Sequence, residues 1–348
     1  MTPGGYFSDI GALFARAATN TGVEERTYRI AGHDVVVRCA GNALLQRTDP
    51  ALTRPATEHD GMARKRAPAV EPSLVVEMFD SVGSGVHIGP MPWSRQDFEP
   101  LGMVEPFCDD RYSTAVDIHT ASLSLFDRET ATARFWLEDA THMAYWQSAE
   151  PLRLILSWWA ATVRMQLTHV AAVAGPAGAA LLVGGGGAGK STTSLSCLAG
   201  GLGFLGDDYC LVAPRPEPTV HRVYNTAKLL PATFDRLPGL RTLARNADRL
   251  DREKAVLDLM PAFAPALVES APVCAIAIPR ITGRFSVRPV SRGSILRAMA
   301  PSTVFGLLGA TPESLSTLAD MARRVPGYEV ELGDDVDCVV STIAALVS

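Results

Sequence analysis

Lysine is scarce in this chain of 348 residues, and basic residues are outnumbered by acidic ones. Of the 32 basic residues only four are lysines, so the other 28 (32 − 4) are arginines. The 37 acidic residues give a net charge of −5, which argues against a broad nucleic-acid-binding surface. A hydrophobic fraction of 47% is ordinary for a globular protein and excludes disorder as the main state. Because lysine is so rare here, each one is a candidate for a specific role. The four are Lys65, Lys190, Lys228 and Lys254.

Paired cysteines are also missing, because none of the six cysteines forms a Cys-x-x-Cys motif. This spacing excludes a zinc ribbon and gives no sign of a disulfide scaffold. We expect buried apolar thiols in a reducing cytosol, and hence a cytoplasmic protein. The six positions are Cys39, Cys108, Cys197, Cys210, Cys274 and Cys338.

No segment reads as a targeting or membrane-spanning element. The first 20 residues lack the basic stretch and apolar run of a signal peptide. Residues 170–189 carry no charge and are long enough to span a bilayer, but they contain seven glycines and one proline. Because glycine and proline are poor helix formers, this composition predicts two short strands and a glycine loop instead.

The pattern of the chain predicts two domains, a β-rich one over residues 1–148 and an α/β one over 149–348. Strand-like runs around a turn at residues 31–34 predict a hairpin, and further strands are expected within 73–79, 113–126 and 132–138. Residues 48–72 are polar and rich in proline, which predicts a long mobile loop. Its basic cluster at 64–66 is more consistent with a solvated loop than with a site for an acidic partner.

The second half alternates strand and helix signals. An apolar helix is expected to begin near Ser148, which is followed by Glu150 and Pro151. The other expected elements are strands near 169–174, 179–184, 204–213 and 273–281, and helices near 190–200, 291–299, 312–324 and 335–347.

Residues 184–191 match the phosphate-binding motif G-x-x-x-x-G-K-[ST], and they lie between a buried-strand run and a helix start. A loop without side chains lets its N–H groups wrap a phosphate, and the following helix adds its positive end. Lys190 supplies a charge for the β- and γ-phosphates, and the Ser191 hydroxyl can hold Mg²⁺. The nucleotide-binding candidates are Gly184, Gly185, Gly186, Gly187, Ala188, Gly189, Lys190, Ser191 and Thr192.

Two adjacent carboxylates, Asp207 and Asp208, follow 17 residues after Lys190 (207 − 190). On its own such a pair is more often a turn cap. Near a phosphate loop, one carboxylate can hold Mg²⁺ and the other can accept a proton from an attacking hydroxyl. Repulsion between them can raise one pKa, which suits a base. A histidine, His169, stands just before the strand that precedes the loop strand, where it can assist proton movement.

His169, LLVGGGGAGKST and GFLGDDY together resemble the catalytic domain of HPr kinase/phosphorylase and its relatives, including enzymes encoded with lasso-peptide genes. The resemblance implies a P-loop kinase core of the phosphoenolpyruvate-carboxykinase type with ATP and Mg²⁺ as cofactors. It implies a base at Asp208 and a metal held by Asp207 and Ser191, or the reverse, with His169 and Lys190 completing the site. Two features differ from the family. Thr192 follows the loop serine where an acid is frequent, and the glycine- and asparagine-rich signature of the bifunctional enzymes is not recognisable.

Two of the four lysines, Lys228 and Lys254, follow the two carboxylates in the sequence. A phosphate clamp is needed there to stabilise charge on the transferred group, and Lys254 is the candidate we retain. Lys228, Arg252 and Arg280 also lie in this part of the chain, and a solvated surface position is the better explanation of each of them taken alone.

The sequence therefore predicts an ATP-dependent kinase that phosphorylates a serine or another hydroxyl of a peptide, protein or small molecule. The alternatives are a nucleotide-responsive regulatory module and an ATPase without an acceptor. Nucleic acid and membrane are not expected as partners, and relatives in this family are commonly homo-oligomers. The loop reads phosphates rather than bases, so ATP, GTP and pyrophosphate are not distinguished.

Overall fold

The computed structural model describes residues 1–53, 71–99, 102–304, 306 and 312–348. Internal contacts divide the chain into two compact units, Met1–Thr162 and Val163–Ser348. Both contain helices and sheets, so the chain is a mixed α/β protein. In the part of the chain described, no helix is long and apolar enough to cross a membrane.

Unit 1 is built on a six-stranded sheet with the order β1-β2-β3-β6-β5-β4. The hairpin turn between β1 and β2 places Ala31 and Gly32 in the left-handed region (φ 49° and 82°), which suits a two-residue turn and confirms the predicted hairpin. The predicted strand run 113–126 proves to be two strands joined by a turn. The strands are β1 (Val23–Ile30), β2 (His33–Ala40), β3 (Leu74–Asp80), β4 (Tyr112–Asp117), β5 (Ser122–Asp127) and β6 (Thr132–Leu137).

The first half of the chain is predicted to be mostly β, but the structure also contains helices there. Helix α1 (Pro3–Thr21) begins with Pro3 at its first position, and the Thr2 hydroxyl accepts a hydrogen bond from the Gly5 N–H at 3.1 Å. Its apolar residues recur with helical spacing and pack on the sheet. The remaining helices of this unit are α2 (Ala43–Leu52), α4 (Ser81–Ser84), α5 (Tyr145–Ala149) and α6 (Arg153–Thr162).

The prediction of a loop over residues 48–72 is wrong for residues 48–52, which are helical. Residues 48–52 form the last turn and a half of α2, where Thr48, Ala51 and Leu52 are buried. Burial of these side chains outweighs the turn-forming preference of Asp49 and Pro50. Residues 54–70, with the basic cluster at 64–66, lie outside the described residues.

Helix α6 belongs to unit 1, because the Trp158 ring stacks on Phe126 of β5 with 6.5 Å between ring centroids. The buried indole of Trp159 also donates a hydrogen bond to the Ser73 carbonyl at 3.0 Å. The division of the chain therefore follows Thr162, later than the boundary after residue 148 that the sequence pattern predicts.

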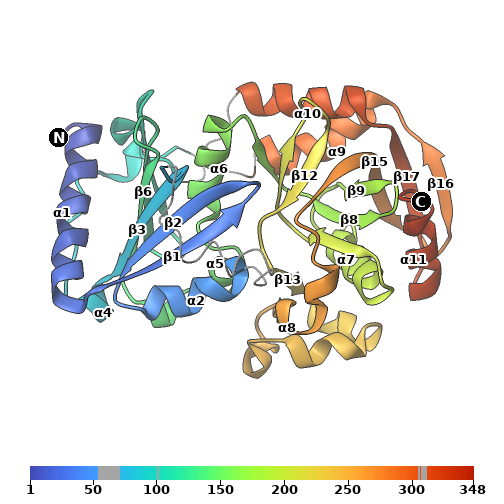
Figure 1. The fold of residues 1–348 in the computed structure, drawn as a ribbon, viewed down its shortest axis with the longest axis horizontal. Helices are drawn as coiled ribbons and strands as arrows, with labels where there is room; N and C mark the ends of the chain where they lie inside the picture. Colours follow the sequence, from blue (N-terminus) through green and yellow to red (C-terminus); the bar gives the residue numbers. More distant parts are fainter. Residues whose placement is uncertain (54–70, 100–101, 305, 307–311) are drawn as a thin grey trace. The chain divides into compact units, whose positions relative to one another are not determined.

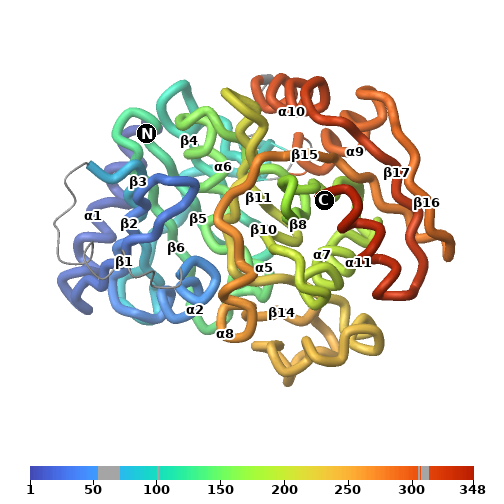
Figure 2. Tube along the Cα trace, turned by 45° about the vertical axis from the view of Figure 1, so that its right-hand side comes forward, coloured from blue at the N-terminus to red at the C-terminus, as the bar shows by residue number. Residues whose placement is uncertain are grey.

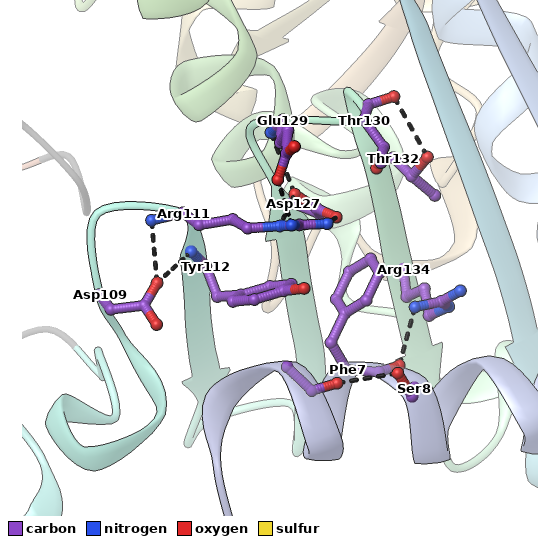
Figure 3. Close-up of polar contacts among 11 residues, drawn as sticks. Phe7, Ser8, Asp109, Arg111, Tyr112, Asp127, Glu129, Thr130, Thr132 and Arg134 are labelled. Carbon is purple, nitrogen blue, oxygen red and sulfur yellow. Dashed lines mark hydrogen bonds and ion pairs between the residues drawn. The ribbon is translucent and has the colours of Figure 1, made fainter.

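An arginine on β6 fixes α1 to the sheet of unit 1 (Figure 3). Arg134 donates from Nη1 to the Phe7 carbonyl at 2.7 Å and from Nε to Glu77 at 2.9 Å, and its guanidinium lies 3.9 Å from the centroid of the Phe7 ring. A side chain at Gly11 would begin 2.5 Å from the Arg134 guanidinium. This helix position therefore has to be glycine for the guanidinium to lie beneath it.

A buried carboxylate in the same sheet is held by a bidentate arginine. Arg111 donates from Nε and Nη2 to the two oxygens of Asp127, at 2.9 and 2.8 Å (Figure 3). Burial alone would raise the pKa of Asp127, but the Arg111 hydrogen bonds hold it below its usual value of 3.8. The stability that the ion pair contributes is thus present above pH 3.8 and is lost as pH falls through the lower pKa of the folded state.

We expect Asp127→Asn to lower the free energy of unfolding at pH 7 by about 2 kcal/mol, since the buried amide cannot accept both hydrogen bonds of Arg111, which keeps only its exposed partner Glu129. Urea unfolding at pH 7 and pH 3 measures this, and the deficit should shrink at the lower pH. Glu25→Gln, which removes an exposed ion pair with Arg38, should cost less than about 1 kcal/mol. An Asp127→Asn deficit that is the same at both pH values would contradict this account.

Unit 2 contains a mixed sheet with the order β10-β8-β9-β15-β12-β11-β7, to which β17 and β16 add beside β15. The long strand β15 joins the two parts, because its first residues pair with β12 and its later ones with β9 and β17. The strands are β7 (Gln166–Thr168), β8 (Ala171–Gly175), β9 (Gly178–Leu182), β10 (Gly203–Gly206), β11 (Cys210–Ala213), β12 (Thr219–Arg222), β13 (Thr226–Leu229), β14 (Ala255–Asp258), β15 (Ser270–Ile281), β16 (Ser286–Pro289) and β17 (Gly327–Leu332).

Helices cover both faces of the β8-β9-β15-β17 part of this sheet (Figures 1 and 2). Alternate residues of β8 explain why: Ala172 packs into the core beneath α9 and α10, and Val173 into the core beneath α7 and α11. The helices are α7 (Lys190–Ala199), α8 (Met260–Phe263), α9 (Arg292–Val304), α10 (Pro312–Arg324) and α11 (Val336–Ala344). The expected helices of this half, and the two strands with a glycine loop over residues 170–189, are confirmed.

A separate two-stranded sheet, β13-β14, packs with short 3-10 helical turns over residues 231–249 around a third core in unit 2. Its apolar residues meet Leu195 and Leu198 of α7. This small sheet therefore lies over the helix that follows the phosphate-binding motif.

Candidate functional site

The motif 184–191 forms the connection from β9 to α7, and three of its glycines have left-handed or related backbone angles. Gly184, Gly187 and Gly189 have φ of 143°, 80° and 90°, a region that other residues rarely adopt. α7 starts at Lys190 without a side-chain cap, so its first N–H groups remain directed toward the loop. This is the local geometry that binds phosphate at a helix N-terminus.

The Lys190 side chain lies along the loop and is almost fully buried. Its Nζ donates to the Gly184 carbonyl at 2.8 Å and to the Gly185 carbonyl at 3.3 Å. Burial lowers the pKa of Lys190, and the charges of Asp208 and Asp207 act in the opposite direction. The ammonium therefore lies within the electrostatic reach of both predicted carboxylates.

A side chain at Gly189 would meet Ile281, because a Cβ there would begin 2.9 Å from Cδ1 of that residue. Gly189→Ala therefore adds a left-handed residue and a clash, and we expect it to lower the free energy of unfolding by about 1–3 kcal/mol. Gly186→Ala is the matched control, since a Cβ at Gly186 meets nothing within 4 Å. Chemical denaturation of the two variants checks this. Equal stability would contradict the loop conformation.

Asp207 directly follows β10 and is buried beside the loop. The Ser191 hydroxyl and the Lys228 backbone N–H, at 2.8 Å, both donate to its carboxylate. Burial, and then the neighbouring charge of Asp208, raise the pKa of Asp207 to about 7. Two close carboxylates, one of them buried with a serine hydroxyl, form a site whose negative charge a cation would stabilise.

Asp208 has a partner for each of its carboxylate oxygens. His169 Nε2 donates a hydrogen bond to Oδ1, and Lys228 Nζ lies 2.8 Å from Oδ2. Burial alone would raise the pKa of Asp208, but the His169 hydrogen bond and the Lys228 charge hold it well below its usual range. Asp208 is therefore an anion whose orientation is fixed by two side chains.

His169 is itself positioned by its surroundings just before β8. Its ring stacks on Tyr209 with 5.1 Å between centroids, and its backbone N–H donates to the Thr303 hydroxyl at 3.2 Å. These contacts fix the ring against Asp208. The structure thus brings His169, Lys190, Ser191 and both carboxylates together, as the sequence motifs predict for one site.

Lys228 is the residue that the predicted site set leaves out. It lies on β13 and is buried, and it contacts one carboxylate through its side chain and the other through its backbone. The signal that points to it is the scarcity of lysine, because two of the four lysines, Lys190 and Lys228, meet at this pair of acids.

The other basic candidates differ in position. Lys254 directly precedes β14 and is exposed. Its positive charge acts on the ammonium of Lys190, which indicates that Lys254 lies near the phosphate loop. Arg280 instead pairs with Glu329 on β17, and Arg252 is exposed beside Asp251. Of these, only Lys254 stays a candidate for contact with phosphate.

Ser191 and Asp207 are suited to a magnesium ion that also binds nucleotide phosphates. Mg²⁺ prefers oxygen ligands and commonly takes one or two from the protein and the rest from phosphates and water. In the described part of the chain, no group of three or more His, Cys, Asp and Glu side chains is arranged to hold a metal ion. The magnesium ligands stay a prediction.

No family model and no curated protein matches this chain. Among solved structures, it is similar to the HPr(Ser) kinase/phosphatase from Coxiella burnetii, with 11% identity and a TM-score of 0.29. The similarity covers 52% of this chain and 93% of that chain. A TM-score this low does not define the fold or the function of unit 2.

Proposed function

We propose that unit 2 is a phosphotransferase of the HPr-kinase type, which transfers the γ-phosphate of ATP to a hydroxyl group. One observation carries the proposal. Ser191 meets Asp207, and His169 and Lys228 meet Asp208, around the Lys190 loop. A loop that only bound phosphate would need neither a second carboxylate nor the two side chains that orient it.

The nucleotide is held by the main chain. Loop N–H groups and the start of α7 bind the phosphates, and Lys190 exchanges the Gly184 and Gly185 carbonyls for β- and γ-phosphate oxygens. Ser191 and Asp207 would hold Mg²⁺, which would supply positive charge beside the phosphates. Asp207 would bind the cation in its ionised form, and this would offset the cost of burying its charge.

Asp208 orients the acceptor hydroxyl and takes its proton. In a loose transition state little charge develops on the attacking oxygen, so positioning of the base matters more than a high pKa. His169 keeps the carboxylate oriented, and Lys228, which pairs with the same carboxylate, contributes positive charge to the transferred phosphoryl group. Lys254, whose charge acts on Lys190, is the candidate for a second cation.

The test is incubation with γ-labelled ATP, Mg²⁺ and a pool of serine-containing peptides. Acid-stable label on serine supports the kinase. Nucleotide binding without transfer to any acceptor would instead identify a nucleotide-responsive module, and release of free phosphate without an acceptor would identify an ATPase. The acceptor class remains part of the proposal.

A further inference from the structure

Three exposed apolar side chains form a strip beside the phosphate loop: Ile281, Phe285 and Val287, with 50, 40 and 40% of their surface exposed. Ile281 pairs with Leu332 and Val287 with Val330, and both partners are buried beneath α7 and α11. Paired residues point to the same face of a sheet, so the apolar strip extends this core face beyond the helices that cover it.

The strip begins at the loop itself. A Cβ at Gly189 would begin 2.9 Å from the end of the Ile281 side chain, so the two residues are in contact. β15 is parallel to β9, and both strands end at the same edge of the sheet. Phe285 continues the strip by packing on Gly333, where a Cβ would begin 2.8 Å from Cε2 of the ring.

The strip ends on an open strand edge. β16 pairs with β17, and the described residues place no strand on its other side (Figure 1). All four residues of β16 are at least partly exposed. Such an edge presents unpaired N–H and C=O groups, to which an extended polypeptide can add as a further strand.

Unpaired arginines give this edge a positive charge. Residues 280–297 contain five arginines and no acidic residue. The charges of Arg280 and Arg288 are balanced by two glutamates of β17, Glu329 and Glu331. Within the described residues, the exposed Arg284 and Arg292 make no ion pair. An acidic segment complements such an edge, and a basic one is repelled by it.

We propose that β16 and the apolar strip dock an extended acidic segment of the polypeptide that carries the acceptor hydroxyl. This inference rests on the proposed function and names its substrate class. Because strand side chains alternate, the docked segment has apolar residues on the face of Val287 and acidic residues on the face of Arg288.

The topology also sets the spacing between the docked segment and the acceptor. From β9 across β15, β17 and β16 to an added strand there are four strand intervals. At about 4.8 Å each they span roughly 19 Å, which about six extended residues cover. The acceptor hydroxyl is therefore expected about six residues from the docked segment.

Binding of synthetic peptides to the full chain tests this without requiring catalysis. The probe carries one serine, five neutral residues and a Val-Glu-Val-Glu-Val segment, and its two counterparts carry Gln or Lys in place of Glu. By fluorescence anisotropy, the Glu peptide should bind about tenfold more tightly than the Gln peptide, and the Lys peptide most weakly. Arg284→Glu should remove this preference. Arg323→Glu, an equal charge change on α10, should not.

N-methylated peptides test addition as a strand. Methylating the amides of one alternate set in the acidic segment should abolish binding, and methylating the other set should not, because only one set faces β16. Equal binding of the Glu, Gln and Lys peptides would overturn the proposal. Self-association of the chain that Arg284→Glu abolishes would also overturn it, since a second copy would then occupy this edge.

The two proposals fail separately. If the Glu peptide binds at β16 but receives no phosphate, the docking stands and the kinase function fails. If all three peptides are phosphorylated equally at subsaturating concentration, the kinase function stands and the docking fails.

Discussion

Asp208→Asn is expected to lower the rate of phosphoryl transfer about 10³-fold while ATP·Mg²⁺ binding remains near the wild-type level. The substitution keeps the size of the side chain but removes the charge that His169 and Lys228 hold in place. The groups that bind nucleotide, Lys190, Ser191 and Asp207, are unchanged. Single-turnover transfer and equilibrium titration with a labelled nucleotide measure the two properties separately.

Asp320→Asn is a control for loss of a buried carboxylate. Asp320 is also buried in unit 2, but it pairs with Arg215 and Arg323 on the side of α10. We expect this variant to transfer phosphate much as the wild type does. An Asp208→Asn variant that keeps full transfer, or that loses nucleotide binding to the same extent as transfer, would show that Asp208 is not the base.

Lys228→Met is expected to lower transfer about 10²-fold and to change its pH dependence. Without the ammonium, one oxygen of Asp208 has no partner in a buried position, and the pKa of Asp208 rises toward its ordinary value. In the wild type, Asp208 stays ionised in mild acid because its pKa is held low. In the variant it becomes protonated at higher pH, so the acid limb of the rate profile moves to higher pH.

Two further variants separate this role from a loss of folding. Lys228→Arg keeps the charge and should recover part of the rate and the wild-type acid limb. In the Asp208→Asn background, Lys228→Met should have a much smaller effect, because the two side chains act as a pair. An unchanged acid limb in Lys228→Met would contradict the pairing.

The parts of the site that the sequence predicts are those that form locally. Residues 184–191 combine a strand, a glycine loop and a helix start in one continuous segment, and backbone sterics determine this arrangement. The two aspartates follow at the end of the next strand after α7, which returns the chain to the same edge of the sheet. Their proximity to Lys190 thus follows from a short connection.

Lys228 shows why the rest of the site is not predictable in this way. It reaches the carboxylates because β13 pairs with β14, whose residues lie 26 or more positions later in the chain, from Ala255 onward (255 − 229). Pairing at such separation depends on the packing of the whole unit, and local patterns do not encode it. The short strands β16 and β17 are likewise absent from the predicted elements, since β17 pairs with both β16 and β15 at long sequence separation.

Two helices of unit 1, α1 and α2, are absent from the elements that the sequence pattern predicts. α1 does carry local helix signals, namely the Thr2 cap, Pro3 and apolar residues at helical spacing. α2 contains Asp49 and Pro50, which local propensity assigns to turns, and burial of its apolar side chains stabilises it instead. Tertiary packing therefore decides α2, whereas local propensity decides the hairpin turn at residues 31–32.

The central claim is that the 184–191 loop and the two carboxylates form one Mg²⁺·nucleotide site. A crystal structure of the chain with Mg²⁺ and a non-hydrolysable ATP analogue tests it most directly. We expect the ion on Ser191 and Asp207, the Lys190 ammonium on the β- and γ-phosphates, and Asp208 facing the γ-phosphate from the acceptor side. Phosphates bound away from the loop, or carboxylates of Asp207 and Asp208 both turned away from the ion, would contradict it.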